Sequence, residues 1–94
     1  MEATVHELEG VLRARHEQRP EGSYTATLFA DRDLVERKIM EEAFETCLEL
    51  GKPTVDTERL VSESADLVFH LMVGLTACGV SLEDVFAELG RRRA

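Results

Sequence analysis

The sequence contains two long stretches of helical periodicity in which polar residues, rather than apolar ones, occupy the narrow side. The first stretch covers residues 34–50. An ordinary surface helix shows the reverse arrangement, a limited apolar stripe on a polar cylinder. We therefore expect most of this helix to be buried. At about 100° per residue, its polar strip spans an arc of about 100° and consists of Lys38, Glu41, Glu42, Glu45 and Glu49.

The second stretch, residues 58–78, repeats this arrangement on a still more apolar background. Its polar residues fall within about 60° of arc, and they are Arg59, Glu63, Asp66 and His70. Little of this helix is expected to face water. Two carboxylates enclosed in such a setting need partners, because burying an unpaired charge is costly.

Start and stop signals predict an all-α fold with short turns, so that consecutive long helices pack as an antiparallel hairpin or bundle. We expect residues 1–94 to form one domain. The predicted helices cover residues 5–16, 34–50, 58–78 and 82–92, and residues 23–30 form a short helical turn. The expected N-caps are Asp33, Asp56 or Thr57, and Ser81, the last in a capping box with Asp84. Gly51 and Gly79 are the expected helix stops.

The composition narrows the partners that such a chain can have. The formal net charge is −8, from 19 acidic and 11 basic residues, which argues against nucleic-acid binding. An acidic protein binds phosphates when a cation bridges the two. We interpret Cys47 and Cys78 as reduced core residues of a cytoplasmic protein. No apolar run approaches the ~18 residues of a membrane span.

The carboxylates of the two strips predict a metal site. Glu42 with Glu45, and Glu63 with Asp66, are each spaced i,i+3 and would point inward together. A solvated acidic face is the usual alternative, but like charges at i,i+4 repel each other. Oxygen ligands suit a hard cation such as Mg²⁺, with Mn²⁺ as a substitute. A di-iron site needs Glu-x-x-His motifs, and His70 stands four residues after Asp66.

The pattern Glu41-Glu42-x-x-Glu45 followed by Glu63-x-x-Asp66 resembles the motif of the all-α NTP pyrophosphatase (MazG-like) superfamily. Within it the chain is most similar to the phosphoribosyl-ATP pyrophosphohydrolases of histidine biosynthesis. The resemblance covers about residues 5 to 90, and residues 22–29, 38–45, 63–71 and 79–85 carry it. The departures from the usual family residues are Met40 for Gly, Ser64 for Ala and Phe69 for Tyr. Met40 adds bulk beside the acidic strip.

The resemblance implies a function and a set of roles. The reaction would convert phosphoribosyl-ATP and water to phosphoribosyl-AMP and pyrophosphate, with Mg²⁺, in a homodimer whose helices share one bundle. The metal ligands would be Glu42, Glu45, Glu63 and Asp66, and Glu41 would orient or deprotonate the attacking water. The expected substrate contacts, whose alternatives are ordinary pairing, capping and packing, are Lys38, Ser23, Tyr24, Thr25 and His70. For His70 a further alternative is a hydrogen bond to Asp66 that supports this metal ligand.

Two other functions fit the same residues. One is a related nucleotide pyrophosphatase that clears non-standard NTPs. The other is a non-catalytic helical dimerisation module with a solvated acidic face. The segment Ser23-Tyr24-Thr25-Ala26 favours the histidine-pathway reaction over the first alternative.

Overall fold

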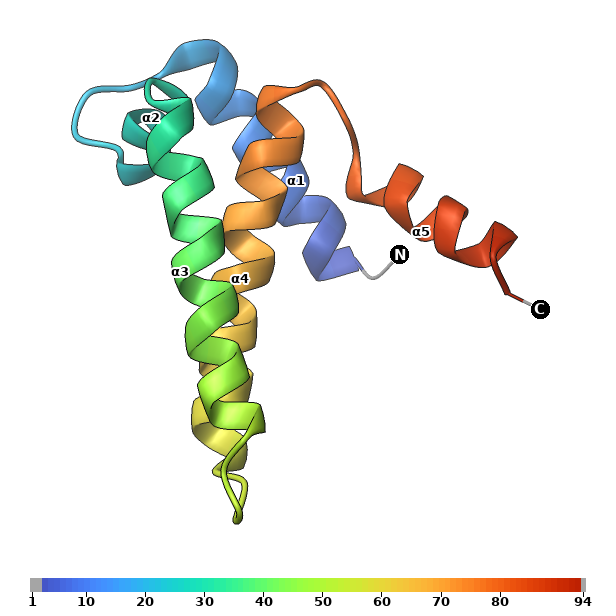
Figure 1. Cartoon of the computed structure of the whole chain (residues 1–94). Coiled ribbons are helices and arrows are strands. Elements are labelled where there is room, and N and C mark those ends of the chain that lie inside the picture. Colours follow the sequence, from blue (N-terminus) through green and yellow to red (C-terminus); the bar gives the residue numbers. More distant parts are fainter. Residues whose placement is uncertain (1–2, 94) are drawn as a thin grey trace.

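The longest feature of the fold is an antiparallel hairpin of α3 (Arg32–Leu50) and α4 (Thr57–Ala77) in the computed structural model, which describes residues 3–93. The connecting turn is short, so the second helix returns along the first (Figure 1). Asp56 caps α4 by accepting a hydrogen bond from the N–H of Arg59. A Schellman motif ends α4: the N–H of Val80 bonds to the carbonyl of Leu75, and Gly79 has φ +73°.

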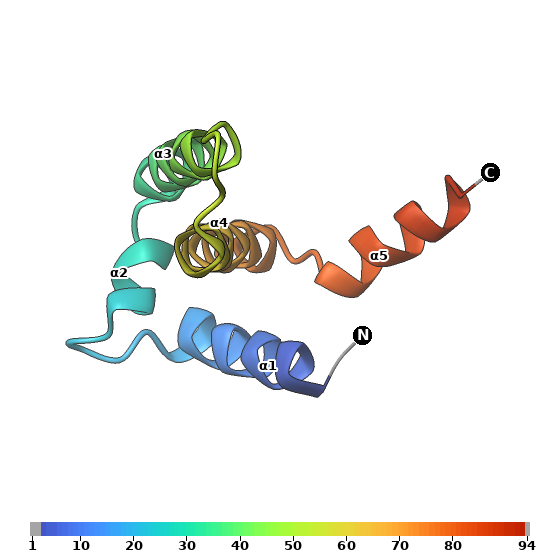
Figure 2. The ribbon, with the colours of Figure 1, turned by 90° about the horizontal axis from the view of Figure 1, so that it is seen from below.

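The remaining helices gather around one end of this hairpin. Helix α1 (Ala3–Gln18) packs against α4, and the short α2 (Tyr24–Phe29) contacts α1, α3 and α4. Figure 2 shows α2 bridging the other helices at one side of the molecule. The core lies among these elements, since its buried apolar residues come from all of them: Leu12, Leu28, Phe29, Val35, Met72, Val73 and Leu82.

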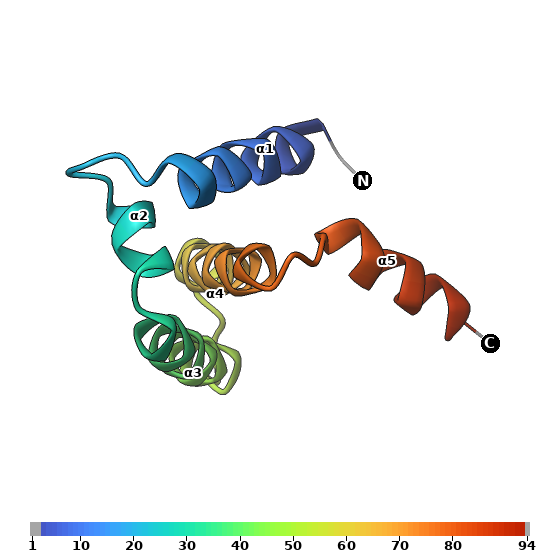
Figure 3. The ribbon, with the colours of Figure 1, turned by 90° about the horizontal axis from the view of Figure 1, so that it is seen from above.

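Helix α5 (Leu82–Arg91) leads away from the rest of the molecule (Figure 3). Its start is fixed, because the buried carboxylate of Glu9 accepts a 2.7 Å hydrogen bond from the N–H of Leu82. Farther along, Phe86 and Leu89 are exposed. The helix is therefore anchored at its first turn, and its apolar side is otherwise open.

The structure confirms the predicted all-α fold and most of the predicted helix ends. Residues 24–29 form the expected short helix, and Ser81 and Asp84 form the expected capping box. The predicted start of α3 was wrong. The carboxylate of Asp31, not of Asp33, accepts a hydrogen bond from the N–H of Leu34, so the helix begins at Arg32.

The two long helices were expected to be mostly buried, but in the structure only one side of each is covered. On α3 the side chains of Met40, Phe44 and Leu48 are more than half exposed, and Val61 on α4 is 62% exposed. The prediction that both cysteines lie in the core was wrong as well. Cys47 lies on the uncovered side of α3, and Cys78 is the C-cap of α4; both are exposed free thiols.

Helix α4 is also apolar and long enough to cross a membrane by length and composition alone. The sequence expectation that no stretch comes near this limit was therefore too broad. Core helices of soluble proteins meet the same criterion. Here α4 packs against α1, α2 and α3, and it carries Glu63 and Asp66 in its middle turns.

Candidate metal centre

Three carboxylates converge where α3 and α4 face each other. Glu42 and Glu45 lie on successive turns of α3, and Glu63 lies opposite them on α4. One oxygen of each can be chosen so that all three lie within 4.8 Å of one another. We call Glu42, Glu45 and Glu63 the carboxylate triad. The i,i+3 spacing on α3 produces this convergence, because it places both side chains on the side of the helix that faces α4.

The triad leaves two buried oxygens without partners. Among the described residues, Oε1 of Glu42 and Oε2 of Glu63 accept no hydrogen bond of good geometry, although Nδ1 of His70 lies 2.5 Å from Oε1 of Glu42. Buried polar atoms are nearly always paired, and a carboxylate can only accept when it is ionised. These oxygens therefore fit a positive partner. An all-oxygen set of this kind is the chemistry that hard divalent cations prefer.

The pKa values of the triad reflect the same electrostatic problem. Burial raises the pKa of Glu42, and the nearby charge of Asp66 raises it further, while His70 opposes the shift. The pKa of Glu63 is raised first by a hydrogen bond with Glu45, then by burial and by the negative charge of Glu45. Each shift shows that the folded chain disfavours a full set of negative charges at this place.

Asp66, the fourth predicted ligand, lies outside this convergent group. Its side chain is exposed, yet its charge raises the pKa of both Glu42 and Glu63, so it lies beside the triad. Glu41 is exposed on α3, and its carboxylate lies 3.9 Å from Nζ of Lys38. The ordinary pairing that the sequence offers for Lys38 is with Glu42, four residues on, but the carboxylate that the structure places within ion-pair distance of Lys38 is that of Glu41.

The segment of residues 23–25, which precedes α3, reaches this site through Tyr24. The hydroxyl of Tyr24 lies 3.0 Å from Nε2 of His70. Ser23 is the N-cap of α2, where its hydroxyl accepts a 3.2 Å hydrogen bond from the N–H of Ala26. Thr25 is half-buried. Ser23 thus has the capping role that the sequence offered as its alternative, and Tyr24 is the member of this segment that reaches the polar residues of α4.

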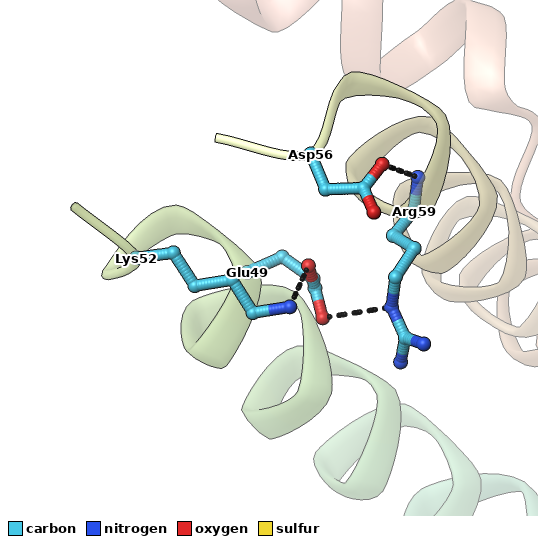
Figure 4. A network of polar contacts seen from close by, with 4 residues as sticks. All are labelled: Glu49, Lys52, Asp56 and Arg59. Carbon is cyan, nitrogen blue, oxygen red and sulfur yellow. Dashed lines mark hydrogen bonds and ion pairs between the residues drawn. The ribbon is translucent and has the colours of Figure 1, made fainter. Parts of the chain in front are cut away.

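A second polar network, one turn beyond the triad, was missed by the sequence reasoning (Figure 4). Glu49 is buried and holds Nζ of Lys52 at 2.8 Å and Nε of Arg59 at 3.3 Å. These two cations lower the pKa of Glu49, chiefly through the hydrogen bond from Lys52. Glu49 is therefore satisfied by the protein itself, unlike the triad. The spacing of Glu49 and Lys52 at i,i+3 was the available signal.

Comparison with known proteins gives a consistent result. A family model described as phosphoribosyl-ATP pyrophosphohydrolase matches residues 5–93. A phosphoribosyl-ATP pyrophosphatase of Metallosphaera sedula is 43% identical over 93 residues, which is 98% of each chain. One from Erythrobacter litoralis is 46% identical over 90 residues, covering 95% of this chain and 85% of that protein. A histidine biosynthesis bifunctional protein of Bacteroides thetaiotaomicron is 41% identical over 88 residues, 93% of this chain and 42% of that protein.

Proposed function

The chain belongs to the phosphoribosyl-ATP pyrophosphohydrolase family, and we propose that it hydrolyses phosphoribosyl-ATP to phosphoribosyl-AMP and pyrophosphate. This reaction is the second step of histidine biosynthesis, and we place it in the cytoplasm. The single observation that supports the proposal most is the carboxylate triad with its unpartnered oxygens, set in a chain that the family model matches over residues 5–93. Residues 1–94 act as one domain.

We assign Mg²⁺, or Mn²⁺ in its place, to Glu42, Glu45 and Glu63, with Asp66 at the edge of the site. The buried oxygens of Glu42 and Glu63 that accept no hydrogen bond support this assignment, because a cation would satisfy both. A bound divalent cation supplies a charge bridge between these carboxylates and the triphosphate, and it lowers the pKa of a water molecule. The net charge of −8 makes such a bridge necessary for an anionic substrate.

The side chains next to the triad carry the other roles. Glu41 is exposed beside the site and accepts the proton of the attacking water. The water oxygen bonds to the α-phosphorus as the bond to the oxygen bridging the α- and β-phosphorus breaks, so pyrophosphate leaves. Lys38, held near Glu41, contributes a point charge toward the phosphates. Ser23 and Thr25, at the start of α2, lie on the side from which Tyr24 reaches α4 and contact the ribose or a phosphate.

Pyrophosphate release from phosphoribosyl-ATP tests this function. We expect release by the purified chain with Mg²⁺ and none after chelation. Glu45→Gln removes a triad charge while keeping the side-chain shape, and it should reduce kcat by roughly 100-fold or more, as loss of a central electrostatic group does. Glu36→Gln, an exposed carboxylate on the same helix, is the matched control and should leave kcat unchanged.

The same assay separates the alternatives. Hydrolysis of dUTP or another NTP with phosphoribosyl-ATP untouched would replace the proposed substrate by non-standard nucleotides. A chain that hydrolyses neither, and whose melting temperature does not respond to Mn²⁺, would be a helical dimerisation module. The similarity to named phosphoribosyl-ATP pyrophosphatases over nearly the whole chain favours the first reaction.

We also propose that the working form is a homodimer. The exposed apolar residues of α3 and α4 support it, since Met40 and Phe44 are each 64% exposed. Contiguous apolar surface of this kind commonly marks a protein interface. A second copy would cover this side of the hairpin and complete the helical bundle.

A further inference from the structure

A chain of polar contacts connects the short helix α2 to the carboxylate triad. Oη of Tyr24 lies 3.0 Å from Nε2 of His70, and Nδ1 of His70 lies 2.9 Å from the backbone oxygen of Asp66. The same Nδ1 lies 2.5 Å from Oε1 of Glu42. The side chains of His70 and Glu42 are only 8% and 10% exposed. The contacts therefore run from the surface, where Tyr24 is half exposed, to a buried member of the triad.

The partners of His70 determine where its protons lie. A backbone carbonyl only accepts hydrogen bonds, so Nδ1 carries a hydrogen that it donates to Asp66. In the neutral ring, Nε2 is then the acceptor, and the hydroxyl of Tyr24 donates to it. Phe69 supports the ring with an edge contact, with centroids 5.1 Å apart. The imidazole is thus fixed in both orientation and tautomer.

This arrangement orients the carboxylate of Glu42. The hydrogen on Nδ1 is directed at the carbonyl of Asp66, and within residues 3–93 Oε1 of Glu42 has no hydrogen-bond partner. The imidazole ring stands directly against this carboxylate and limits its rotation. Groups that hold a metal ligand in place in this way commonly change metal affinity by about 10- to 100-fold when they are removed.

We propose that Tyr24 and His70 are positioning residues for Glu42, which set the affinity of the triad for its divalent cation without contacting the cation or the substrate. The inference rests on the proposed function, because it takes the triad as a metal site. It reassigns Tyr24 and His70, which the sequence resemblance offered as substrate contacts. It also gives α2 a task that its sequence does not reveal, since the hydroxyl of Tyr24 keeps the ring of His70 in place.

Calorimetric titration of the full chain with Mn²⁺ alone provides the direct test. Tyr24→Phe keeps the aromatic ring and removes the hydroxyl, and we expect it to weaken Mn²⁺ binding by about 10-fold. Thr27→Val is the matched control, because it removes a hydroxyl from the same helix that bonds only to the backbone of Ser23. We expect the control to bind Mn²⁺ as the wild type does.

A double-variant cycle shows whether Tyr24 acts through His70. His70→Asn preserves a donor near the position of Nδ1 and loses the contact with Tyr24, so adding Tyr24→Phe should cause no further loss of affinity. The proposal would be overturned if Tyr24→Phe weakened Mn²⁺ binding equally in the wild type and in His70→Asn. If His70→Asn fails to fold, the result for Tyr24→Phe alone decides.

Steady-state kinetics distinguish positioning from substrate contact. At saturating Mn²⁺, Tyr24→Phe should leave KM for phosphoribosyl-ATP unchanged. A raised KM with unchanged Mn²⁺ affinity would overturn the proposal while leaving the proposed reaction intact. A wild-type chain that binds no Mn²⁺ would overturn both, because the triad would then not be a metal site.

Discussion

Glu45 and Glu63 meet across the seam between α3 and α4, and two carboxylates can share a hydrogen bond only when one of them carries a proton. That hydrogen bond, with burial and the charge of Glu45, raises the pKa of Glu63. A cation bound by the same oxygens would displace the proton and offset the repulsion. The residues that we propose as metal ligands are therefore residues whose mutual repulsion destabilises the metal-free fold.

Replacing Glu63 by Gln should stabilise the metal-free fold and abolish its stabilisation by metal. The raised pKa means that the folded state favours the uncharged form, and Gln imitates that form. At neutral pH we expect metal-free Glu63→Gln to melt above the metal-free wild type. The rise in melting temperature with Mn²⁺ should be lost, because such a rise requires binding to the folded state. Thermal unfolding with and without Mn²⁺ measures both effects, and a variant that Mn²⁺ stabilises as strongly as the wild type would contradict them.

Glu49 shows the opposite electrostatic behaviour and predicts a pH dependence. Its pKa is lowered by the hydrogen bond from Lys52 and by the charge of Arg59. A lowered carboxyl pKa stabilises the fold above the unfolded pKa, and the contribution disappears as pH falls through the folded pKa. Glu49→Gln should therefore destabilise the chain at pH 7 and have a smaller effect below about pH 4. Urea unfolding at the two pH values measures this, with Glu36→Gln as the control; an equal loss at both would refute it.

At the residue scale, sequence spacing along a helix predicted which side chains lie next to each other on the same side of that helix. The i,i+3 pair Glu42 and Glu45 converges as expected with Glu63 from the next helix. Asp66 was one expected partner of His70, but the accepting atom was not predictable, because Nδ1 bonds to the backbone carbonyl of Asp66 rather than to its carboxylate. Helical periodicity assigns a residue to a side of a helix, but it does not choose between backbone and side-chain acceptors.

At the scale of the helix, competing signals explain the one misplaced helix start. Asp31 and Asp33 both belong to a residue type that is preferred at the N-cap. Glu36 favoured Asp33, because the two residues match the capping-box pattern. In the structure Asp31 accepts from Leu34, and Asp33 lies in the first turn, where a negative charge is also favourable. The sequence contains both signals, and the structure uses Asp31 as the N-cap.

Gly74 within α4 and Gly79 just beyond its C-cap predict opposite effects for substitution by alanine. A Cβ at Gly74 would lie 3.5 Å from Cγ1 of Val35 and 3.6 Å from Cδ1 of Ile39, which are ordinary contact distances. Gly74→Ala should therefore stabilise the chain by about 0.5–1 kcal/mol through helix propensity. Gly79 has φ +73°, and Gly79→Ala should destabilise it by about 1 kcal/mol. Chemical denaturation measures both, and destabilisation by Gly74→Ala would show that α3 and α4 pack more tightly there.

At the scale of the whole molecule, the periodicity of the two long helices predicted more burial than a single chain provides. Residues 34–50 and 58–78 were expected to be largely enclosed, yet Phe44 and Val61 are more than 60% exposed. A pattern of apolar residues records every surface that a chain covers in its working state, including surfaces covered by a second chain. Periodicity therefore predicted the all-α hairpin correctly but could not separate the core from the apolar surface that the single chain leaves exposed.

Phe44→Glu tests whether a second copy covers this surface. In a two-fold symmetric dimer the substitution occurs twice, and at about 2 kcal/mol for each well-buried aromatic it should weaken association by roughly a thousandfold. Light scattering after size exclusion should give the wild type twice the 10.5 kDa of one chain and the variant the mass of one. Val11→Glu is the matched control, because Val11 is an exposed apolar residue on α1, which is not part of the hairpin. Wild-type protein that is monomeric at micromolar concentration would refute the dimer. A Phe44→Glu variant that remains dimeric would instead move the interface to another surface, for which the open apolar side of α5, with Phe86 and Leu89, is the next to substitute.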